Sequence, residues 1–204
     1  MEARERGLNK DFPQYGDADG AARLLEDMAN KTGAGAVFSK GIIAAAKELD
    51  MAGDAVHVKG MELPGYEPRA TWGMALAYAT SDRGGCHQRA WTVLGELDGY
   101  LPRFSTEGMA ATVKTIQDER AAAYSLVVCD FAPYEQERAL ACLRHVTGWD
   151  ITEEEYLAAG ERTWNHTRLF NAREAGVSRK DDTLPPRMLE DPLPMPPRGE
   201  EKVS

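Results

Sequence analysis

Apolar residues recur every three or four positions along most of the chain, which is the spacing of one face of a helix. The strongest local signal is Thr152-Glu-Glu-Glu155, a capping box in which a Thr hydroxyl and a Glu carboxylate each bond an orphan backbone amide. It predicts that the longest helix begins there and ends at Gly176. Shorter helices are predicted from Asp17 or Asp19 to Gly33, over 36–49, over 72–80, for about fifteen residues after Ser105, and from Pro133 to Gly148.

Both ends of the chain and one internal stretch depart from this pattern. Residues 54–69 alternate and then bring two prolines and a glycine, which predicts a short extended piece and an ordered loop. Six of the eleven prolines lie between Pro185 and Pro197, so no regular helix is expected beyond Gly176. The sequence therefore predicts a mainly α fold, with a disordered N-terminus over 1–15, a helical region over 16–176 and a Pro-rich extended tail over 177–204.

Composition narrows the class of protein. The chain has 204 residues, with 24 Lys and Arg against 33 Asp and Glu, so its net charge is −9 and no nucleic-acid partner is expected. No stretch approaches the roughly 20 apolar residues of a membrane span, and the N-terminus lacks the apolar run of a signal peptide. The three cysteines have no pairing pattern, which favours a reducing, cytoplasmic location.

One loop combines residue types that suit chemistry. Arg83-Gly-Gly-Cys-His87 places two glycines, which let a backbone approach its neighbour closely, directly before a thiol and an imidazole. It is either a loop lining a cofactor pocket or the end of a helix followed by a chance Cys-His pair. On the residues alone, both interpretations stay open.

The remaining cysteines and histidines carry weaker signals. Cys129 ends an apolar run, Leu126–Cys129, that is expected to be buried, and it is itself either a small core side chain or a ligand. Cys142, between two apolar residues of a predicted helix, is expected in the core, and His145 could share its face. His166 is expected to be solvated or structural. Three cysteines so far apart do not form a zinc site or an iron–sulfur cluster by a local motif.

Taken in order, several segments resemble the aldehyde ferredoxin oxidoreductase family, the tungsten- or molybdenum-pterin enzymes with an iron–sulfur cluster. The resemblance runs from about Gly16 to Pro197, and distinct motifs in the right order make it specific. The matching segments are His57–Arg69, Gly73–His87, Val146–Thr152, Gly160–Arg162, Phe170–Glu174 and Asp181–Arg187.

The resemblance implies an activity and a set of partners. Family members oxidise an aldehyde to the acid and pass electrons through a 4Fe-4S cluster to ferredoxin, and an N-terminal β-rich domain seats a tungsten- or molybdenum-bis-pterin. This chain resembles the helical C-terminal part, without that cofactor domain or the Cys-x-x-Cys-x-x-x-Cys run that supplies three cluster ligands. It is therefore expected to be a fragment or a separate subunit that holds no cluster alone, and to expose apolar surface or form a homo-oligomer.

The resemblance also implies roles for individual residues. His87 matches a histidine near the metal, where it would act as acid or base, and Cys129 matches the isolated fourth cluster ligand. Tyr124 and Val128 fall in the pterin-contacting motif, in which Tyr124 replaces an acid and Val127 replaces a glycine. Two other functions stay open: a non-catalytic helical subunit or binding module derived from the family, and a family member acting on an aromatic acyl thioester.

Overall fold

The helices follow the order that the apolar spacing predicts. The computed structural model describes residues 1–129, 131 and 135–193, and within them the fold is mainly α, as predicted. The part described contains one antiparallel pair of two-residue strands. The elements are α1 (Glu2–Glu5), α2 (Ala18–Asn30), α3 (Ile42–Glu48), β1 (His57–Val58), β2 (Met61–Glu62), α4 (Trp72–Thr80), α5 (Val93–Leu97), α6 (Met109–Ser125), α7 (Gln136–Thr147), α8 (Glu153–Ala175) and α9 (Pro186–Glu190).

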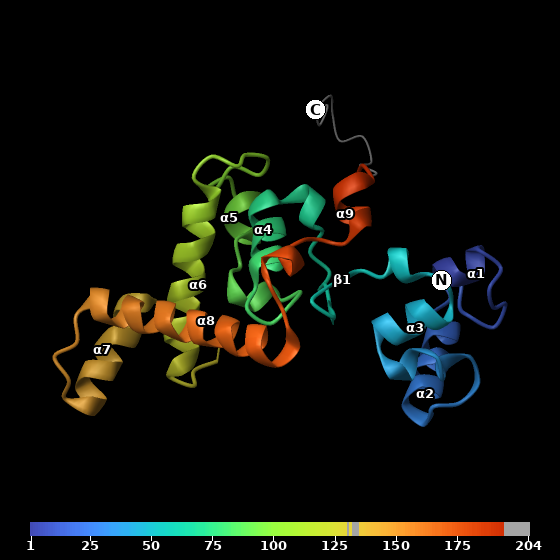
Figure 1. Cartoon of the computed structure of the whole chain (residues 1–204), viewed down its shortest axis with the longest axis horizontal. Helices are drawn as coiled ribbons and strands as arrows, with labels where there is room; N and C mark the ends of the chain where they lie inside the picture. The colour runs from blue at the N-terminus through green and yellow to red at the C-terminus, as the bar shows by residue number, and fades with distance from the viewer. Residues whose placement is uncertain (130, 132–134, 194–204) are drawn as a thin grey trace.

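Helices α1–α3 lie at one end of the molecule, and the chain passes from them through β1 into a larger body built around α4–α8 (Figure 1). In the small body Phe12 is 1% exposed, and its ring centre lies 5.1 Å from that of Phe38. In the larger body Met74 and Tyr78 of α4 are fully buried and pack with Val113 of α6. Apolar side chains are therefore buried in separate clusters at the two ends.

Helix α8 runs across α6 at close range (Figure 1). Gly160 makes this approach possible, because a Cβ at that position would overlap the carbonyl oxygen of Asp118 and lie 2.9 Å from the backbone nitrogen of Ala122. Any side chain at residue 160 would push the two helices apart. The glycine thus sets the spacing of the longest helix pair in the larger body.

Local signals at helix ends are partly confirmed. The Glu155 N–H donates to the Thr152 hydroxyl at 3.2 Å, and the Thr152 N–H donates to the Glu155 carboxylate at 2.9 Å, so the capping box forms as predicted. The single helix predicted over 36–49 is wrong: a 3₁₀ turn at Phe38–Lys40 is separated from α3 by Gly41, whose φ of 84° interrupts the helix. The predicted helix start at Pro133 lies outside the described residues.

The chain ends differ from the expectation of a disordered N-terminus and a tail without helix. Helix α9 begins at Pro186, the first helical position, where the missing N–H is not needed and the fixed φ suits a helix. The Arg187 guanidinium donates to both carboxylate oxygens of Glu2, at 2.9 and 2.6 Å, and to Asp54 at 3.1 Å. These long-range ion pairs hold α1 close to α9. They could not be predicted from the spacing of apolar residues.

Candidate functional site

The loop that carries His87 packs against the β1–β2 hairpin. The Gly85 N–H donates to the carbonyl of Val58 at 3.2 Å. A Cβ on Gly84, whose φ is 125°, would lie 2.7 Å from that same carbonyl oxygen, and a Cβ on Gly85 would lie 2.8 Å from the carbonyl oxygen of Met61. The two glycines therefore serve close backbone approach to the hairpin, and a loop that lines a cofactor pocket stays a prediction. The glycines are not the C-cap of the preceding helix, because α4 ends at Thr80 and is capped by Ser81.

His87 opens a 3₁₀ turn (His87–Arg89) and lies among aromatic rings. Its ring centre is 5.4 Å from that of Tyr66 and 6.4 Å from that of Trp91, and the Tyr66 and Trp91 centres are 6.1 Å apart. The preceding Cys86 is buried, and the Arg83 guanidinium approaches its sulfur to 2.8 Å. The imidazole is thus half-buried beside two large apolar rings.

Two residues after His87, Arg89 joins this loop to the end of α6. Its Nε lies 3.1 Å from a carboxylate oxygen of Asp82, which is 1% exposed, and its guanidinium carbon lies 4.1 Å from the centre of the Tyr124 ring. Neither Asp82 oxygen accepts an aligned hydrogen bond from the described residues, so Arg89 compensates the charge through proximity. The loop and the segment that leads to Cys129 are therefore held together.

A second buried charged residue, Lys59, holds the β1–β2 hairpin against the rest of the larger body. The Lys59 side chain is 3% exposed, and its ammonium donates to the carbonyl of Ala79 at 2.6 Å and pairs with Asp182 at 2.8 Å. Burial lowers the pKa of Lys59. Arg168 of α8 donates to both carboxylate oxygens of Asp182, at 2.7 and 2.6 Å. Burial alone would raise the pKa of Asp182, but the hydrogen bonds from Arg168 and Lys59 outweigh it and lower that pKa.

Lys59 is placed by the hairpin turn itself. Lys59 and Gly60 both have positive φ, at 50° and 86°, as a two-residue turn of this twist requires. The turn swings the lysine toward α4, where it ties the hairpin to α8 and to the segment before α9. The local sequence around Asp182 gives no sign of these ion pairs, because Lys59 and Arg168 belong to other segments of the chain.

The segment after α6 turns outward. Val127 has a φ of 59°, in the left-handed region that glycine favours, and its side chain is 93% exposed. The resemblance expects a glycine at this position, and the left-handed backbone explains why glycine would suit it. Val127 adopts the same conformation but loses stability, because its Cβ is crowded there. The prediction of a buried run before Cys129 is wrong here, because Val127 and Val128 project from the end of the helix instead of packing under it.

Two of the three cysteines are exposed. Cys129 lies at the surface, where its sulfur accepts a hydrogen bond from the Phe131 N–H at 3.4 Å. Cys142 was expected in the core and is exposed instead, because α7 packs inward through Ala139 and Leu140 on another face. With Val128 it lines an open apolar groove of about 360 Å³. His145 and His166 are exposed, as expected for His166.

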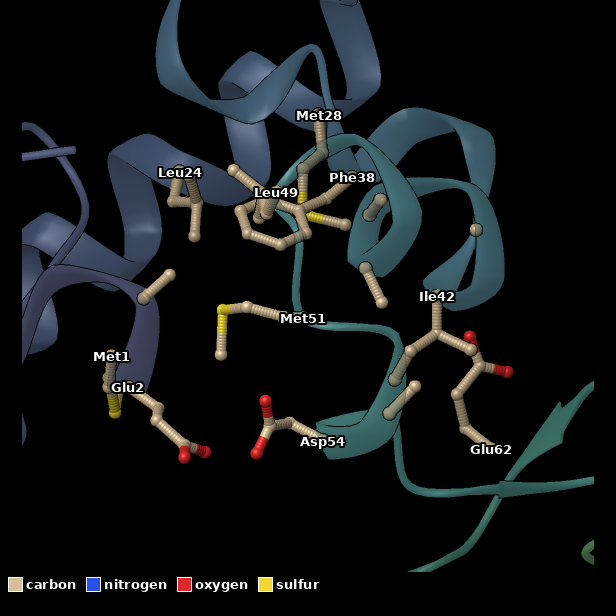
Figure 2. A pocket seen from close by; sticks show the side chains of 15 residues that line it. Met1, Glu2, Leu24, Met28, Phe38, Ile42, Leu49, Met51, Asp54 and Glu62 are labelled. Carbon is tan, nitrogen blue, oxygen red and sulfur yellow. The ribbon is translucent and has the colours of Figure 1, made fainter. Parts of the chain in front are cut away.

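Sequence reasoning missed a second hollow, in the small body formed by α1–α3. Figure 2 shows apolar side chains around it, among them Leu24, Met28, Phe38 and Met51, with the carboxylate of Asp54 at its edge. Its volume is about 420 Å³. The apolar stripes of the helices were visible in the sequence, but the space between them depends on how the helices pack. The hollow leaves apolar surface of α2 and α3 uncovered.

The residues predicted for the site are only partly brought together. Arg89 links the His87 loop to Tyr124, whereas Cys129 and Val128 lie beyond the turn at Val127. Among the described residues, no three His, Cys, Asp or Glu side chains could hold a metal ion together. No helix in the same part of the chain is long and apolar enough to cross a membrane.

Comparison with known proteins decides the family. The family described as "Aldehyde ferredoxin oxidoreductase, domains 2 & 3" matches residues 1–204. The chain belongs to the aldehyde ferredoxin oxidoreductase family. The tungsten-containing aldehyde ferredoxin oxidoreductase of Pyrococcus furiosus is 34% identical over 209 residues, which cover 95% of this chain and 34% of that protein.

Other aldehyde ferredoxin oxidoreductases give the same result. The tungsten-containing protein of Pyrococcus abyssi is 32% identical over 211 residues, covering 95% of this chain and 34% of its own length. That of Thermococcus kodakarensis is 32% identical over 189 residues, covering 89% of this chain and 31% of its own length. The chain therefore spans about a third of the length of the relatives that it matches.

Proposed function

We propose that this chain is part of an enzyme that oxidises aldehydes to carboxylic acids with ferredoxin as the electron acceptor. The observation that carries the proposal is the exposed thiol of Cys129, in a chain that spans about a third of the length of its tungsten-containing relatives. A cysteine at the surface, just beyond the end of the well-packed helix α6, is open to a metal group whose other ligands lie outside these 204 residues.

Cys129 is the residue whose position fits a 4Fe-4S cluster. Such a cluster takes about four thiolates, and the described residues contain no group of three His, Cys, Asp or Glu side chains that could hold a metal ion. The other three ligands and the seat of a tungsten- or molybdenum-bis-pterin would thus come from a cofactor domain outside these 204 residues. When bound, these groups supply the redox chemistry, while the chain contributes a thiolate and the surface around it.

His87 is the proposed acid–base group. Oxidation of an aldehyde to its acid consumes one water and releases two protons and two electrons, so the site needs a group that accepts a proton. Imidazole changes its charge near neutral pH and is suited to this task. His87 would take a proton on a ring nitrogen, while the half-buried rings of Tyr66 and Trp91 shield one side of the imidazole from water.

The residues at the expected pterin contacts do not fit a pterin. The ring of Tyr124 lies under the guanidinium of Arg89, and Val128 offers no hydrogen-bonding side chain and lines an apolar groove. An acid in place of Tyr124 could accept hydrogen bonds from a pterin, whereas this tyrosine is engaged in packing. We therefore assign no pterin contact to Tyr124 or Val128.

The test uses the chain co-expressed with a polypeptide that carries the cofactor domain and the three-cysteine run. His87→Gln is expected to lower aldehyde oxidation by about 10²- to 10⁴-fold, the usual contribution of a general acid or base, with iron content unchanged. His166→Gln, at an exposed position on α8, is the matched control and should retain activity. Full activity of His87→Gln would refute the assignment.

A second candidate function is a non-catalytic helical subunit of such an enzyme. It is favoured by the packing of Tyr124 under Arg89 and by the left-handed Val127, two departures within the motif that precedes Cys129. In that case the co-expressed complex would form with the same stoichiometry but would oxidise no aldehyde, and His87→Gln would change nothing that can be measured.

A further inference from the structure

We propose that Tyr66 and Trp91 are positioning residues that orient the imidazole of His87, an inference that rests on the acid–base role proposed for that histidine. The three ring centres form a closed triangle with sides of 5.4, 6.4 and 6.1 Å. Each side falls within the range of about 4.5–7 Å over which aromatic pairs attract one another. The imidazole is therefore in contact with two rings that are also in contact with each other.

The three rings come from separate segments that are each fixed to the body of the protein. Tyr66 lies in the loop after the hairpin, His87 opens its 3₁₀ turn, and Trp91 precedes α5. Tyr66 and Trp91 both pack against the core cluster of α4 and α6. The backbone carbonyl of Tyr66 also accepts a hydrogen bond from the hydroxyl of Tyr78, at 3.3 Å. Burial raises the pKa of Tyr78, so this hydroxyl remains a donor at neutral pH.

Trp91 contacts His87 through its aromatic ring and not through a hydrogen bond from its indole N–H. The two planes are 74° apart, an edge-on arrangement, and the Tyr66 plane is 50° from that of the imidazole. The buried indole N–H of Trp91 donates no hydrogen bond within the described residues. Trp91→Phe would therefore keep an aromatic ring beside His87 and remove only an unused donor, whereas Trp91→Leu would remove the ring.

This difference between ring and aliphatic replacements gives a direct test on the full 204-residue chain. The NMR signals of the imidazole carbon-bound protons are assigned to His87 by their loss in His87→Gln. Ring currents should displace them from the signals of the exposed His166. Trp91→Leu and Tyr66→Leu should move the His87 signals toward those of His166. Trp91→Phe and Tyr66→Phe should leave them displaced, and signals of His57, on β1, report that the hairpin is intact.

Four outcomes decide the inference. His87 signals that coincide with those of His166 in the unchanged chain, or that do not move in either leucine variant, would overturn it. If the leucine variants fail to fold, the phenylalanine variants decide, because loss of the displacement in both would also overturn it. The retained displacement in Trp91→Phe, together with its loss in Trp91→Leu, supports it.

The readout separates this inference from the proposed function. Ring-current displacement does not depend on aldehyde oxidation, so a displaced His87 in an enzyme that tolerates His87→Gln would leave the positioning intact and refute the acid–base role. In the assembled enzyme, Trp91→Leu should lower kcat by up to about 10²-fold, the cost of a misplaced catalytic group, with little change in KM. Trp91→Phe should recover most of that loss.

Discussion

The guanidinium of Arg89 lies between the buried carboxylate of Asp82 and the ring of Tyr124, 3.1 Å from the first and 4.1 Å from the centre of the second. Through this contact, the loop that carries His87 is joined to the helix that leads to Cys129. The loop of the proposed acid–base group is thus tied to the helix that precedes the proposed cluster ligand.

Removing Arg89 should therefore destabilise the chain strongly. Arg89→Gln removes the cation that pairs with the buried Asp82 carboxylate, which costs about 3–5 kcal/mol of unfolding free energy. Urea denaturation at neutral pH measures the loss. The double variant Arg89→Gln with Asp82→Asn should recover part of it, because no charge is then left unpaired. A loss below about 1 kcal/mol in Arg89→Gln would show that the pair is unimportant.

Val127 should be improved by glycine. A side chain in the left-handed region costs roughly 1–2 kcal/mol, more than the 0.5–1 kcal/mol that glycine loses in backbone entropy. Val127→Gly is therefore expected to raise the unfolding free energy by up to about 1 kcal/mol, as measured by urea denaturation. Val128→Gly is the matched control, since Val128 does not have a positive φ and should only be destabilised. Equal losses in both variants would contradict the account.

Gly160 should not tolerate a methyl group. Its Cβ would overlap the Asp118 carbonyl, so Gly160→Ala forces α8 away from α6 and should cost about 1–3 kcal/mol despite the better helix propensity of alanine. Asn165→Ala, at an exposed position of the same helix, should be neutral or slightly stabilising. Thermal unfolding of the two variants side by side measures the difference, and an unchanged Gly160→Ala would show that the helices do not touch there.

Acid should loosen the contact between the two ends of the chain. The hydrogen bond from Arg187 lowers the pKa of Glu2 to about 2, from an ordinary value of 4.5. Because the folded pKa is depressed, this stabilisation is complete above about pH 4.5 and is lost as the pH falls toward 2.

The pair is partly exposed, so screening limits its contribution to about 1 kcal/mol. Unfolding free energies of Glu2→Gln and the unchanged chain should differ by that amount at pH 7 and converge near pH 2. A constant difference across this range would exclude Glu2 as the titrating group.

Features set by residues close together in the sequence could be predicted, whereas features set by contacts between distant segments could not. The capping box of Thr152 and Glu155 is complete within four residues, and it formed as predicted. The contacts between Tyr66, His87 and Trp91 join three segments, and no local spacing indicates them. The same limit explains other differences.

The prediction that Cys142 is buried was wrong, because apolar neighbours along a helix do not indicate which face of that helix packs against the rest of the protein. The short helix at Pro186 was missed because proline was weighed as a helix breaker and not as a first residue. Identification of the family depended on motif order rather than on any of these local features.

Iron content is the most direct test of the central claim that Cys129 is a cluster ligand completed by ligands outside these 204 residues. Iron is measured, with the electron paramagnetic resonance spectrum of the reduced sample, for the chain alone and for the complex with the cofactor-domain polypeptide. The claim predicts no stable cluster in the chain alone, a full cluster in the complex, and a lost or altered spectrum in Cys129→Ala but not in the control Cys142→Ala, which removes another exposed thiol. An unchanged cluster in Cys129→Ala, or a stable cluster in the chain alone, would contradict it.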